Sequence, residues 1–375
     1  MSRKPRDTSR VFDAADERHM RAALRLAARG AGRTSPNPMV GTLIVRRGRV
    51  LASGWHHRAG EAHAEVDALC KLGGRAEGAT VYVNLEPCNH HGRTGPCTDA
   101  LLAAGVSRVV VGMIDPNPIV NGGGLERLRR AGVRVDTGCL EAECRRLNEA
   151  FICAMTRRRP LVSLKLAATA DGQLATRDGH SAWVTGEAAR RHVHRLRARV
   201  DAVMVGVNTV LADDPTLNVR LTPGRDPLRI IVDSTARTPP TAKLLREGQG
   251  AVWIATTARA PKRRVLALEA SGAEVLRIGA TAAGRVELSD LMRQAAARGV
   301  LSILCEGGAR VAGALVDAGL VDKVIFFYAP KLAGGGRPMV DGAGPANMTD
   351  ALPLRAPRMR RIGEDFVLEA DVSLT

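Results

Sequence analysis

Aromatic residues are scarce in this 375-residue sequence, where tryptophan, tyrosine and phenylalanine together make up 3% of the chain. A hydrophobic core must therefore consist mainly of alanine, valine and leucine. Long hydrophobic runs are also missing, since no stretch reaches the ~18 apolar residues that a membrane-spanning helix needs. The first ten residues contain no apolar segment typical of a signal peptide. We therefore expect a cytosolic protein with no membrane partner.

The remaining composition is ordinary for a globular protein. It has 45% hydrophobic and 25% charged residues, which excludes wholesale disorder. Glycine and proline are plentiful but follow no short period, which excludes a collagen-like chain. The cysteine count is seven, and an odd number without an export signal favours reduced thiols over a disulfide framework.

Positive charge is in excess, with 55 lysine and arginine residues against 38 acidic ones and a formal net charge of +17. Such an excess is compatible with a polyanionic or phosphorylated partner. The arginines are dispersed, however, and few aromatic residues lie between them to stack on bases. We interpret most of the charge as a solvated surface and expect no specific nucleic-acid partner.

The length suggests two domains. The polar, basic residues 1–12 predict a flexible arm, followed by a first domain over 13–156 and a second over 160–375. The boundary lies where three arginines, Arg157–Arg159, precede a proline. We interpret this arginine tract as a solvated linker.

Hydrophobic periodicity predicts alternating strands and helices in both domains. In the first domain it predicts strands at 42–45, 50–53, 80–85, 106–112 and 133–137, and helices at 16–28, 63–72, 98–104, 124–131 and 141–155. In the second it predicts strands at 161–167, 202–206, 229–233, 251–255, 274–278, 301–305 and 323–329, and helices at 186–199, 288–297 and 310–318. This alternation indicates two layered α/β domains, the first with a largely parallel central region.

One histidine and two cysteines of the first domain form a pattern suited to zinc. Glu65 lies two residues after His63, and Cys88 and Cys97 each follow a proline. Three such ligands leave the fourth tetrahedral position open for water, as catalytic zinc requires. Zinc lowers the pKa of that water, and Glu65 can carry protons from it to the departing ammonia. A His-x-Glu segment with Pro-Cys pairs is typical of zinc nucleobase deaminases.

The spacing leaves a structural zinc site as an alternative. Eight residues separate Cys88 from Cys97, whereas the usual deaminase spacing is Cys-x2-Cys. A structural site would close with a fourth protein ligand, and His90 or His91 could supply it. We favour the catalytic interpretation because His-x-Glu lies upstream and a helix is predicted after each ligand segment.

At these residues the sequence resembles a known family, the bifunctional deaminase–reductases of riboflavin biosynthesis. The deaminase half is matched by the stretch from Asn84 to Cys97 and by Ser35-Pro36-Asn37-Pro38, Ala59-Gly60-Glu61 and Asp115-Pro116-Asn117-Pro118. The wide cysteine spacing is normal in that family. The resemblance implies a cytidine-deaminase-like α/β/α domain that deaminates a diaminopyrimidinone carrying ribose 5-phosphate. It implies zinc bound by His63, Cys88 and Cys97, with Glu65 as the proton donor.

Three further residues are candidates for binding the substrate in this domain. Asn37 lies in a proline-flanked loop and could present its amide to a pyrimidine edge, or it could form an ordinary Asx turn. We favour base recognition because of the resemblance. His90 and Arg93 lie between the two cysteines and could hold a substrate phosphate, with a solvated loop as the alternative.

The second half lacks a Gly-x-Gly-x-x-Gly motif after its first strand, which argues against a standard Rossmann domain. Glycines follow Glu306 instead, between a predicted strand and helix, where a phosphate could approach backbone N–H groups. Tight packing of strand on helix explains these glycines nearly as often. Arg197 and Arg220 could clamp a phosphate or lie on a solvated face, and Trp183 could simply fill the core.

The resemblance extends over this half as well. It is carried by Leu164-Lys165, Asp171-Gly172, Leu211 to Pro215, Asp233-Ser234, Glu306-Gly307-Gly308, Ala329-Pro330-Lys331-Leu332 and Gly334-Gly335-Gly336. It implies a dihydrofolate-reductase-like α/β domain that uses NADPH. The implied NADP site comprises Ala167, Trp183, Thr209, Asp213, Ser234 and Gly308. The implied substrate contacts are Ser181, Arg197, Leu217, Arg220 and Glu306. Lys165 is a further candidate near the reacting ribose, or a surface lysine at a strand end.

We therefore predict a homo-oligomeric enzyme of riboflavin synthesis with two activities. Zinc-dependent deamination of the phosphorylated pyrimidine is followed by reduction of its ribosyl group to ribityl. Two alternatives are a nucleic-acid base deaminase and a zinc-stabilised nucleic-acid-binding protein. Neither explains the arginines and the NADP-like positions of the second domain.

Overall fold

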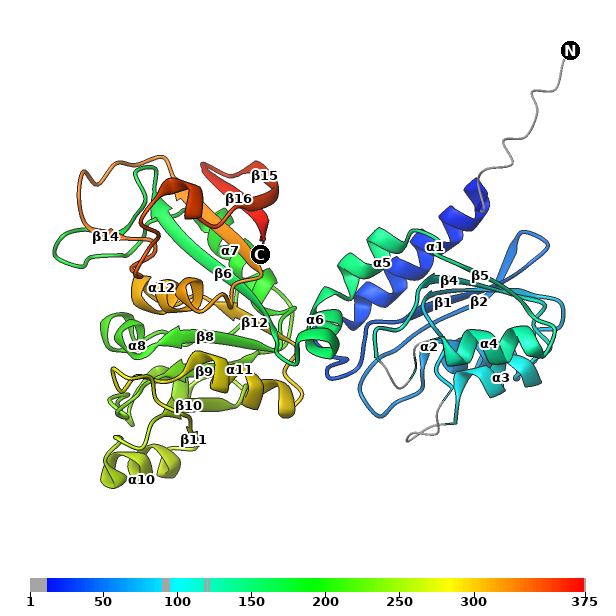
Figure 1. Cartoon of the computed structure of the whole chain (residues 1–375), viewed down its shortest axis with the longest axis horizontal. Helices are drawn as coiled ribbons and strands as arrows, with labels where there is room; N and C mark the ends of the chain where they lie inside the picture. Colours follow the sequence, from blue (N-terminus) through cyan, green and yellow to red (C-terminus); the bar gives the residue numbers. More distant parts are fainter. Residues whose placement is uncertain (1–11, 90–94, 118–119, 121, 374–375) are drawn as a thin grey trace, which may run out of the picture. The chain divides into compact units, whose positions relative to one another are not determined.

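The computed structural model describes residues 12–89, 95–117, 120 and 122–373 (Figure 1). The chain divides into two compact units, Met1–Arg157 and Arg158–Thr375. Within the described part, no helix is both long enough and apolar enough to cross a membrane. The two units are described separately below.

The sheet of the first unit has the strand order β2-β1-β3-β4-β5. Its strands are β1 (Gly41–Arg46), β2 (Arg49–Trp55), β3 (Thr80–Leu85), β4 (Arg108–Met113) and β5 (Arg134–Thr137). Strands β3, β4 and β5 are parallel, whereas β1 is antiparallel to both β2 and β3. The strands predicted from the sequence are confirmed within a few residues, and the parallel region covers one side of the sheet.

Helices cover both faces of this sheet (Figure 1). Helices α1 (Ala14–Ala27) and α5 (Glu141–Leu147) contact one face, where Met20, Leu43, Tyr82 and Val110 form a buried cluster. On the opposite face, α2 (Ala64–Cys70), α3 (Cys97–Ala103) and α4 (Gly123–Arg130) bury leucines against the valines of β3 and β4. A short 3-10 turn, η1 (Ala28–Gly30), follows α1. The result is the expected α/β/α arrangement.

The last helix of the first unit is interrupted, so the single helix predicted at 141–155 is wrong. Helix α5 ends at Leu147 and α6 (Glu149–Arg157) starts after Asn148. Asn148 is 1% exposed; its Oδ1 accepts from the Met39 N–H at 2.8 Å and its Nδ2 donates to the Met39 carbonyl at 3.0 Å. Asparagine side chains readily compete with helical hydrogen bonds in this way.

Replacing Asn148 with alanine should destabilise the first unit by ~1–3 kcal/mol, because the partly buried Met39 backbone groups would lose partners. The Met39 carbonyl would retain the Asn84 amide, which also donates to it at 3.0 Å, so the unpaired N–H should dominate the loss. Urea unfolding of wild type and Asn148→Ala would measure the difference. Unchanged stability would show that water replaces the side chain.

The large sheet of the second unit has the order β11-β10-β9-β8-β12-β6-β13-β16-β15. Its strands are β6 (Leu161–Thr169), β8 (Ala202–Gly206), β9 (Leu228–Val232), β10 (Val252–Thr256), β11 (Glu274–Arg277), β12 (Ser302–Cys305), β13 (Lys323–Ala329), β15 (Leu354–Ile362) and β16 (Asp365–Val372). The strands from β11 to β13 in this order are parallel, and β16 and β15 add an antiparallel hairpin. A small separate ladder pairs β7 (Gln173–Ala175) with β14 (Arg337–Pro338).

Helices bury both faces of this sheet as well. Helices α11 (Leu288–Ala297) and α12 (Ala309–Asp317) contribute to one buried cluster, and α8 (Val207–Asp213) and α10 (Lys262–Ala270) contribute to another. Helix α7 (Glu187–Arg197) packs near β13 and β16, and two short segments complete the unit, α9 (Lys243–Arg246) and η2 (Met348–Asp350). The predicted strands and helices are confirmed. The sequence analysis did not predict α8, α9, α10 or the β15–β16 hairpin.

The interpretation of the whole arginine tract as a solvated linker is wrong for Arg159. Its guanidinium makes a two-pronged ion pair with Asp322, at 2.6 and 2.8 Å, and both residues are buried. Asp322 also accepts from the Val162 N–H at 2.8 Å. Arg157 and Arg158 are exposed. The ion pair therefore anchors the start of β6 within the second unit.

Candidate active sites

The ligand atoms of His63, Cys88 and Cys97 converge in the first unit, all within 4.8 Å of one another. His63 Nδ1 lies 3.2 Å from Cys97 Sγ and 3.4 Å from Cys88 Sγ. Neighbouring corners of a zinc tetrahedron with ordinary Zn–N and Zn–S bonds are separated by about 3.6 Å. The three atoms therefore fit one zinc ion.

The fold brings these ligands together from three segments. His63 is the residue before α2, Cys97 is the first residue of α3, and Cys88 follows β3 after Glu86 and Pro87. The close packing of α2 on β2 depends on Gly54, where a Cβ would lie 2.2 Å from the Ala64 carbonyl oxygen. A side chain at this position would push away the helix that carries the histidine.

The pKa values of the Cys88 and Cys97 thiols are shifted in opposite directions. A hydrogen bond from the Cys97 thiol, together with His63, lowers the pKa of Cys88 to about 4. The pKa of Cys97 is raised, chiefly by its hydrogen bond to Cys88 and by burial. One ligand is thus prepared as a thiolate, the form that binds metal.

Glu65 lies beside the ligands without belonging to the group. It is in the first turn of α2 and 3% exposed. Burial, with a contribution from Cys88, raises the pKa of its carboxyl group to about 7. A carboxyl group that titrates near neutrality is suited to both taking and giving a proton.

His56 connects Asn37 to the ligand cluster, and the sequence analysis missed it. Its Nδ1 is 3.0 Å from the Ala62 carbonyl, which can only accept, so Nδ1 carries the proton. Its Nε2 therefore accepts from Asn37 Nδ2, also at 3.0 Å. The ring of His56 meets that of His63 edge-on, with centroids 5.6 Å apart. Asn37 is thereby held beside His56, and its role in base recognition stays a prediction.

Glu86 organises the loop that carries Cys88, and it too was missed. Its buried carboxylate accepts from the backbone N–H groups of Asp115, Gly122 and Gly124, at 2.9–3.2 Å. Only its position beside the Pro-Cys pair could have indicated this role. His90, His91 and Arg93 lie outside the described residues, so the fourth-ligand alternative and the phosphate interpretation stay predictions.

A cavity of about 1400 Å³ opens in the second unit at the carboxyl ends of β6, β12, β8 and β9. Ligands of parallel α/β sheets commonly bind at this edge. The cavity lining includes the predicted positions Lys165, Ala167, Ser181, Trp183, Arg197, Thr209, Asp213, Arg220, Ser234, Glu306 and Gly308. Leu217 is not brought to the lining; its side chain is 3% exposed and belongs to a buried cluster with Val207 and Val210.

Three charged side chains, each 7–14% exposed, form a largely buried group at the β6–β12 end of the cavity. Glu306 accepts from Arg197 Nε at 2.6 Å and Nη2 at 3.0 Å, and Lys165 Nζ lies 3.8 Å from its Oε2. Burial acts to raise the pKa of Glu306, but Arg197 and Lys165 outweigh it and hold the pKa below its usual value. Burial lowers the pKa of Lys165. Lys165 is thus a cavity group and not a surface lysine.

Arg220 differs from Arg197 in its partners. Its guanidinium is exposed and donates to Thr216 Oγ1 and Asn218 Oδ1. Its backbone N–H donates to His194 Nδ1 at 3.1 Å. Burial, with Arg197 and Arg220, lowers the pKa of His194 to about 4, so the imidazole is neutral near pH 7. Arg220 therefore presents the more available charge.

The remaining predicted residues lie around the same cavity. Trp183 is 66% exposed, and the Arg190 guanidinium lies 4.5 Å from the centre of its ring, so it is not a core residue. Ser181 Oγ donates to Asp213 at 3.3 Å. Gly308 precedes α12 with a φ of 20°, and a Cβ there would contact Thr209 Oγ1.

The folds and sites together define a zinc-type nucleobase deaminase unit followed by a reductase unit. Residues 13–113 match the family described as the cytidine and deoxycytidylate deaminase zinc-binding region, and residues 160–368 match the RibD C-terminal domain. The chain belongs to the RibD family of bifunctional riboflavin-biosynthesis enzymes.

Relatives match over nearly the whole length. The riboflavin biosynthesis protein RibD of Escherichia coli K12 is 42% identical over 373 residues, covering 94% of this chain and 98% of its own. The RibD protein of Aquifex aeolicus is 40% identical, covering 94% and 97%. A crystal form of Acinetobacter baumannii RibD superposes with a TM-score of 0.86 at 37% identity, covering 96% of this chain and 99% of its own.

The expected fold class is confirmed, with a cytidine-deaminase-like unit before a dihydrofolate-reductase-like unit. The chain is an enzyme with deaminase and reductase activities in riboflavin biosynthesis. Zinc and a nicotinamide cofactor are the groups that these two domains use. The match over residues 160–368 argues against both nucleic-acid alternatives.

Proposed function

We propose that the first unit, residues 13–156, deaminates 2,5-diamino-6-(5-phosphoribosylamino)pyrimidin-4(3H)-one hydrolytically. We propose that the second, residues 160–375, then reduces the ribosyl group to ribityl with NADPH. A solved relative from Thermotoga maritima, 34% identical with a TM-score of 0.84, is named for these two reactions. The observation that carries the proposal is the joint presence of a zinc-ligand cluster beside a buried glutamate and a polar cavity at a parallel sheet edge.

His63, Cys88 and Cys97 hold the zinc ion in this proposal. Bound zinc supplies a Lewis acid that activates water for attack on the amino-bearing pyrimidine carbon. Glu65 takes a proton from the water and delivers it to the amino group, which leaves as ammonia while the ring carbon becomes a carbonyl. Its burial beside the ligands excludes bulk water from this transfer. Asn37, fixed by His56, presents its amide to the pyrimidine, and His90 and Arg93 hold the phosphate.

In the second unit, residues at the sheet edge would hold the nicotinamide cofactor, which would supply a hydride. Ala167, Trp183, Thr209, Asp213, Ser234 and Gly308 form its site. NADPH supplies the hydride that reaches the ribosyl C1′. Ser181, Arg197, Arg220 and Glu306 contact the substrate, and Lys165 holds a proton near the sugar oxygen released when the ring opens. Leu217 stays outside this set, because it is buried and does not belong to the described cavity lining.

One assay tests both reactions. Purified protein is given the phosphoribosyl diaminopyrimidinone, with or without zinc and with or without NADPH. We expect ammonia release to require zinc but not NADPH. We expect NADPH to be oxidised only after deamination. Ammonia release that survives complete zinc removal would contradict the first assignment. A cytosolic location, a homo-oligomeric state and weak, salt-sensitive binding to nucleic acids stay predictions.

Arg220→Ala should raise the substrate KM of the reductase roughly 10- to 150-fold. A charge-assisted hydrogen bond to a phosphate contributes ~1.5–3 kcal/mol, and 1.4 kcal/mol corresponds to tenfold. NADPH affinity and ammonia release should stay nearly unchanged. Steady-state kinetics with pre-deaminated substrate would measure the change. Arg199→Ala, an exposed arginine outside the cavity lining, is the matched control. Weaker NADPH binding in Arg220→Ala would show that substrate and cofactor positions are exchanged.

A further inference from the structure

The segment that carries Arg220 has no regular structure of its own. Residues 214–220 follow α8 and belong to neither a helix nor a strand. Two of them, Asp214 and Leu217, have φ angles of 39° and 53°, in the left-handed region that residues other than glycine rarely adopt. The Leu217 side chain is buried, whereas Arg220 is exposed at the cavity. The position of Arg220 therefore depends on contacts from other parts of the second unit.

Three consecutive residues of this segment are held through their backbone by side chains from outside it. The Asn218 carbonyl accepts from Arg197 Nη1 at 3.0 Å, the Val219 N–H donates to Asp226 Oδ1 at 2.7 Å, and the Arg220 N–H donates to His194 Nδ1 at 3.1 Å. His194 and Arg197 lie three residues apart on α7, so they face the same side of that helix. Helix α7 thus supplies two of the three anchors.

His194 differs from the other two anchors because its side chain serves only this segment. Arg197 is also part of the largely buried charged group, and Asp226 also accepts from the Gln249 N–H at 2.8 Å. Among the residues that the structure describes, the side chain of His194 has a single hydrogen-bond partner, the Arg220 N–H. An imidazole nitrogen accepts from an N–H only while it is unprotonated. Burial and the neighbouring arginines lower the pKa of His194 to about 4, so Nδ1 remains an acceptor near pH 7.

The Arg220 guanidinium follows the position of this backbone. It donates to Thr216 Oγ1 at 2.9 Å and to Asn218 Oδ1 at 3.1 Å, both within the same segment. We propose that His194 is a positioning residue of the reductase, which fixes the Arg220 backbone and so aims the guanidinium at the substrate phosphate. This inference rests on the proposed reductase function and adds a residue that acts on the substrate through Arg220.

Substitutions at His194 separate hydrogen bonding from packing. Leucine suits a buried position but cannot accept a hydrogen bond. Asparagine carries Oδ1 on Cγ, where histidine carries Nδ1, so it can still accept from the Arg220 N–H. His194→Ala removes the acceptor without adding a side chain that has to fit. His192→Leu is the matched control, since His192 lies on the same helix, beside Phe327, and is absent from the described cavity lining.

The test measures KM and kcat of the full-length, zinc-loaded chain with pre-deaminated substrate at saturating NADPH. His194→Leu and His194→Ala should raise the substrate KM roughly 3- to 10-fold, which is the contribution of one ordinary hydrogen bond. The value of kcat should change less than about twofold, because the phosphate is bound equally in the ground state and the transition state. His194→Asn and His192→Leu should keep KM within about twofold of wild type. The dissociation constant of NADPH should be unchanged in all four variants.

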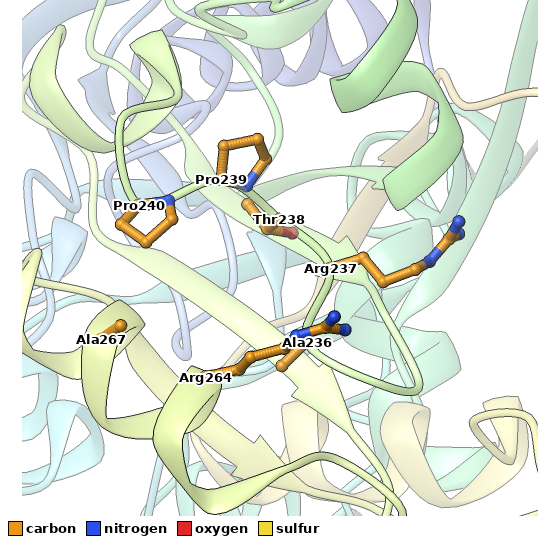
Figure 2. Close-up of a pocket in the computed structure, with 7 residues that line it drawn as sticks. All are labelled: Ala236, Arg237, Thr238, Pro239, Pro240, Arg264 and Ala267. Atoms are coloured by element: carbon orange, nitrogen blue, oxygen red, sulfur yellow. The ribbon is translucent and has the colours of Figure 1, made fainter.

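A double-mutant cycle shows whether His194 acts through Arg220. In the Arg220→Ala background, His194→Leu should raise KM less than about twofold further, because no guanidinium is left to position. Arg264 provides a second cycle without coupling, since it borders a smaller hollow of about 460 Å³ together with Pro239 and Ala267 (Figure 2). It is absent from the described lining of the large cavity. In the Arg264→Gln background, His194→Leu should therefore have its full effect on KM.

The outcomes separate this inference from the proposed function. A wild type that does not reduce the pre-deaminated substrate contradicts the reductase proposal itself. An active wild type in which His194→Leu keeps its full effect without the Arg220 guanidinium overturns only the role of His194. His194→Asn with a KM as high as that of His194→Leu also overturns it, because the acceptor at Cγ would then be irrelevant. A parallel loss of NADPH affinity overturns it as well, since a disturbed fold would explain the KM.

Discussion

Glu65→Gln should release ammonia from the diaminopyrimidinone at least ~10²–10⁴-fold more slowly than wild type, the range for general acid–base groups. Glutamine has nearly the same shape but cannot take a proton from water. Glu65 is 3% exposed, so no solvent base can replace its carboxyl group at close range. Glu65 does not belong to the ligand group, so the variant should keep its zinc.

Two controls make this result specific. Metal analysis should find about one zinc per chain in wild type and in Glu65→Gln, whereas Cys97→Ala should lose the metal. Reduction of pre-deaminated substrate with NADPH should proceed at the wild-type rate, because the described lining residues of the reductase cavity all belong to the second unit. Near-normal ammonia release with zinc present would show that another group moves the proton.

Glu306→Leu should destabilise the second unit by ~3–5 kcal/mol, since it leaves Lys165 and Arg197 buried without their carboxylate. This loss corresponds to a factor of roughly 10²–10³ or more in the folding equilibrium. The rate of hydrogen exchange of the backbone amides in β6 and β12 measures the stability of this region directly. We expect exchange of these amides to accelerate by that factor, while β3 and β4 of the first unit keep their protection.

The pH dependence gives this prediction a second readout. The pKa of Glu306 is lower in the folded chain than its usual value. The Glu306 carboxylate therefore contributes its full stabilisation at any pH above the ordinary carboxyl range, near pH 4. The contribution is lost as the pH falls through the lowered pKa. The stability difference between wild type and Glu306→Leu should therefore shrink below about pH 4. A difference that is independent of pH would point to lost packing instead of a lost ion pair.

Local patterns were sufficient to predict the framework of both units. Buried strands such as Thr80–Leu85 and amphipathic helices such as Leu288–Ala297 appear in the sequence as short apolar runs or regular periods. The zinc cluster was also predictable, because each ligand lies in a recognisable local motif. Interactions between distant segments were not predictable. The Asn148–Met39 hydrogen bonds that interrupt the helix join residues 109 positions apart.

Contacts between distant segments also kept parts of the two sites from being predicted. His56 and Glu86 act through backbone groups of other loops, which no spacing rule reveals. The buried group of Lys165, Arg197 and Glu306 joins β6, α7 and the end of β12, so only the folded sheet shows that two cations share one carboxylate. The β15–β16 hairpin was missed because its first strand is exposed and rich in arginine, without the apolar alternation of a half-buried strand.

That arginine-rich strand has a consequence for how the protein resists aggregation. β15 ends the strand order of the large sheet, and an open edge is a template for adding strands from other chains. It carries Arg355, Arg358, Arg360 and Arg361 together with Pro357, and its register shifts between Arg355 and Arg358. Charge repulsion, a missing N–H donor and the local irregularity all oppose edge-to-edge pairing. Part of the large positive charge thus keeps the sheet from growing into insoluble polymers.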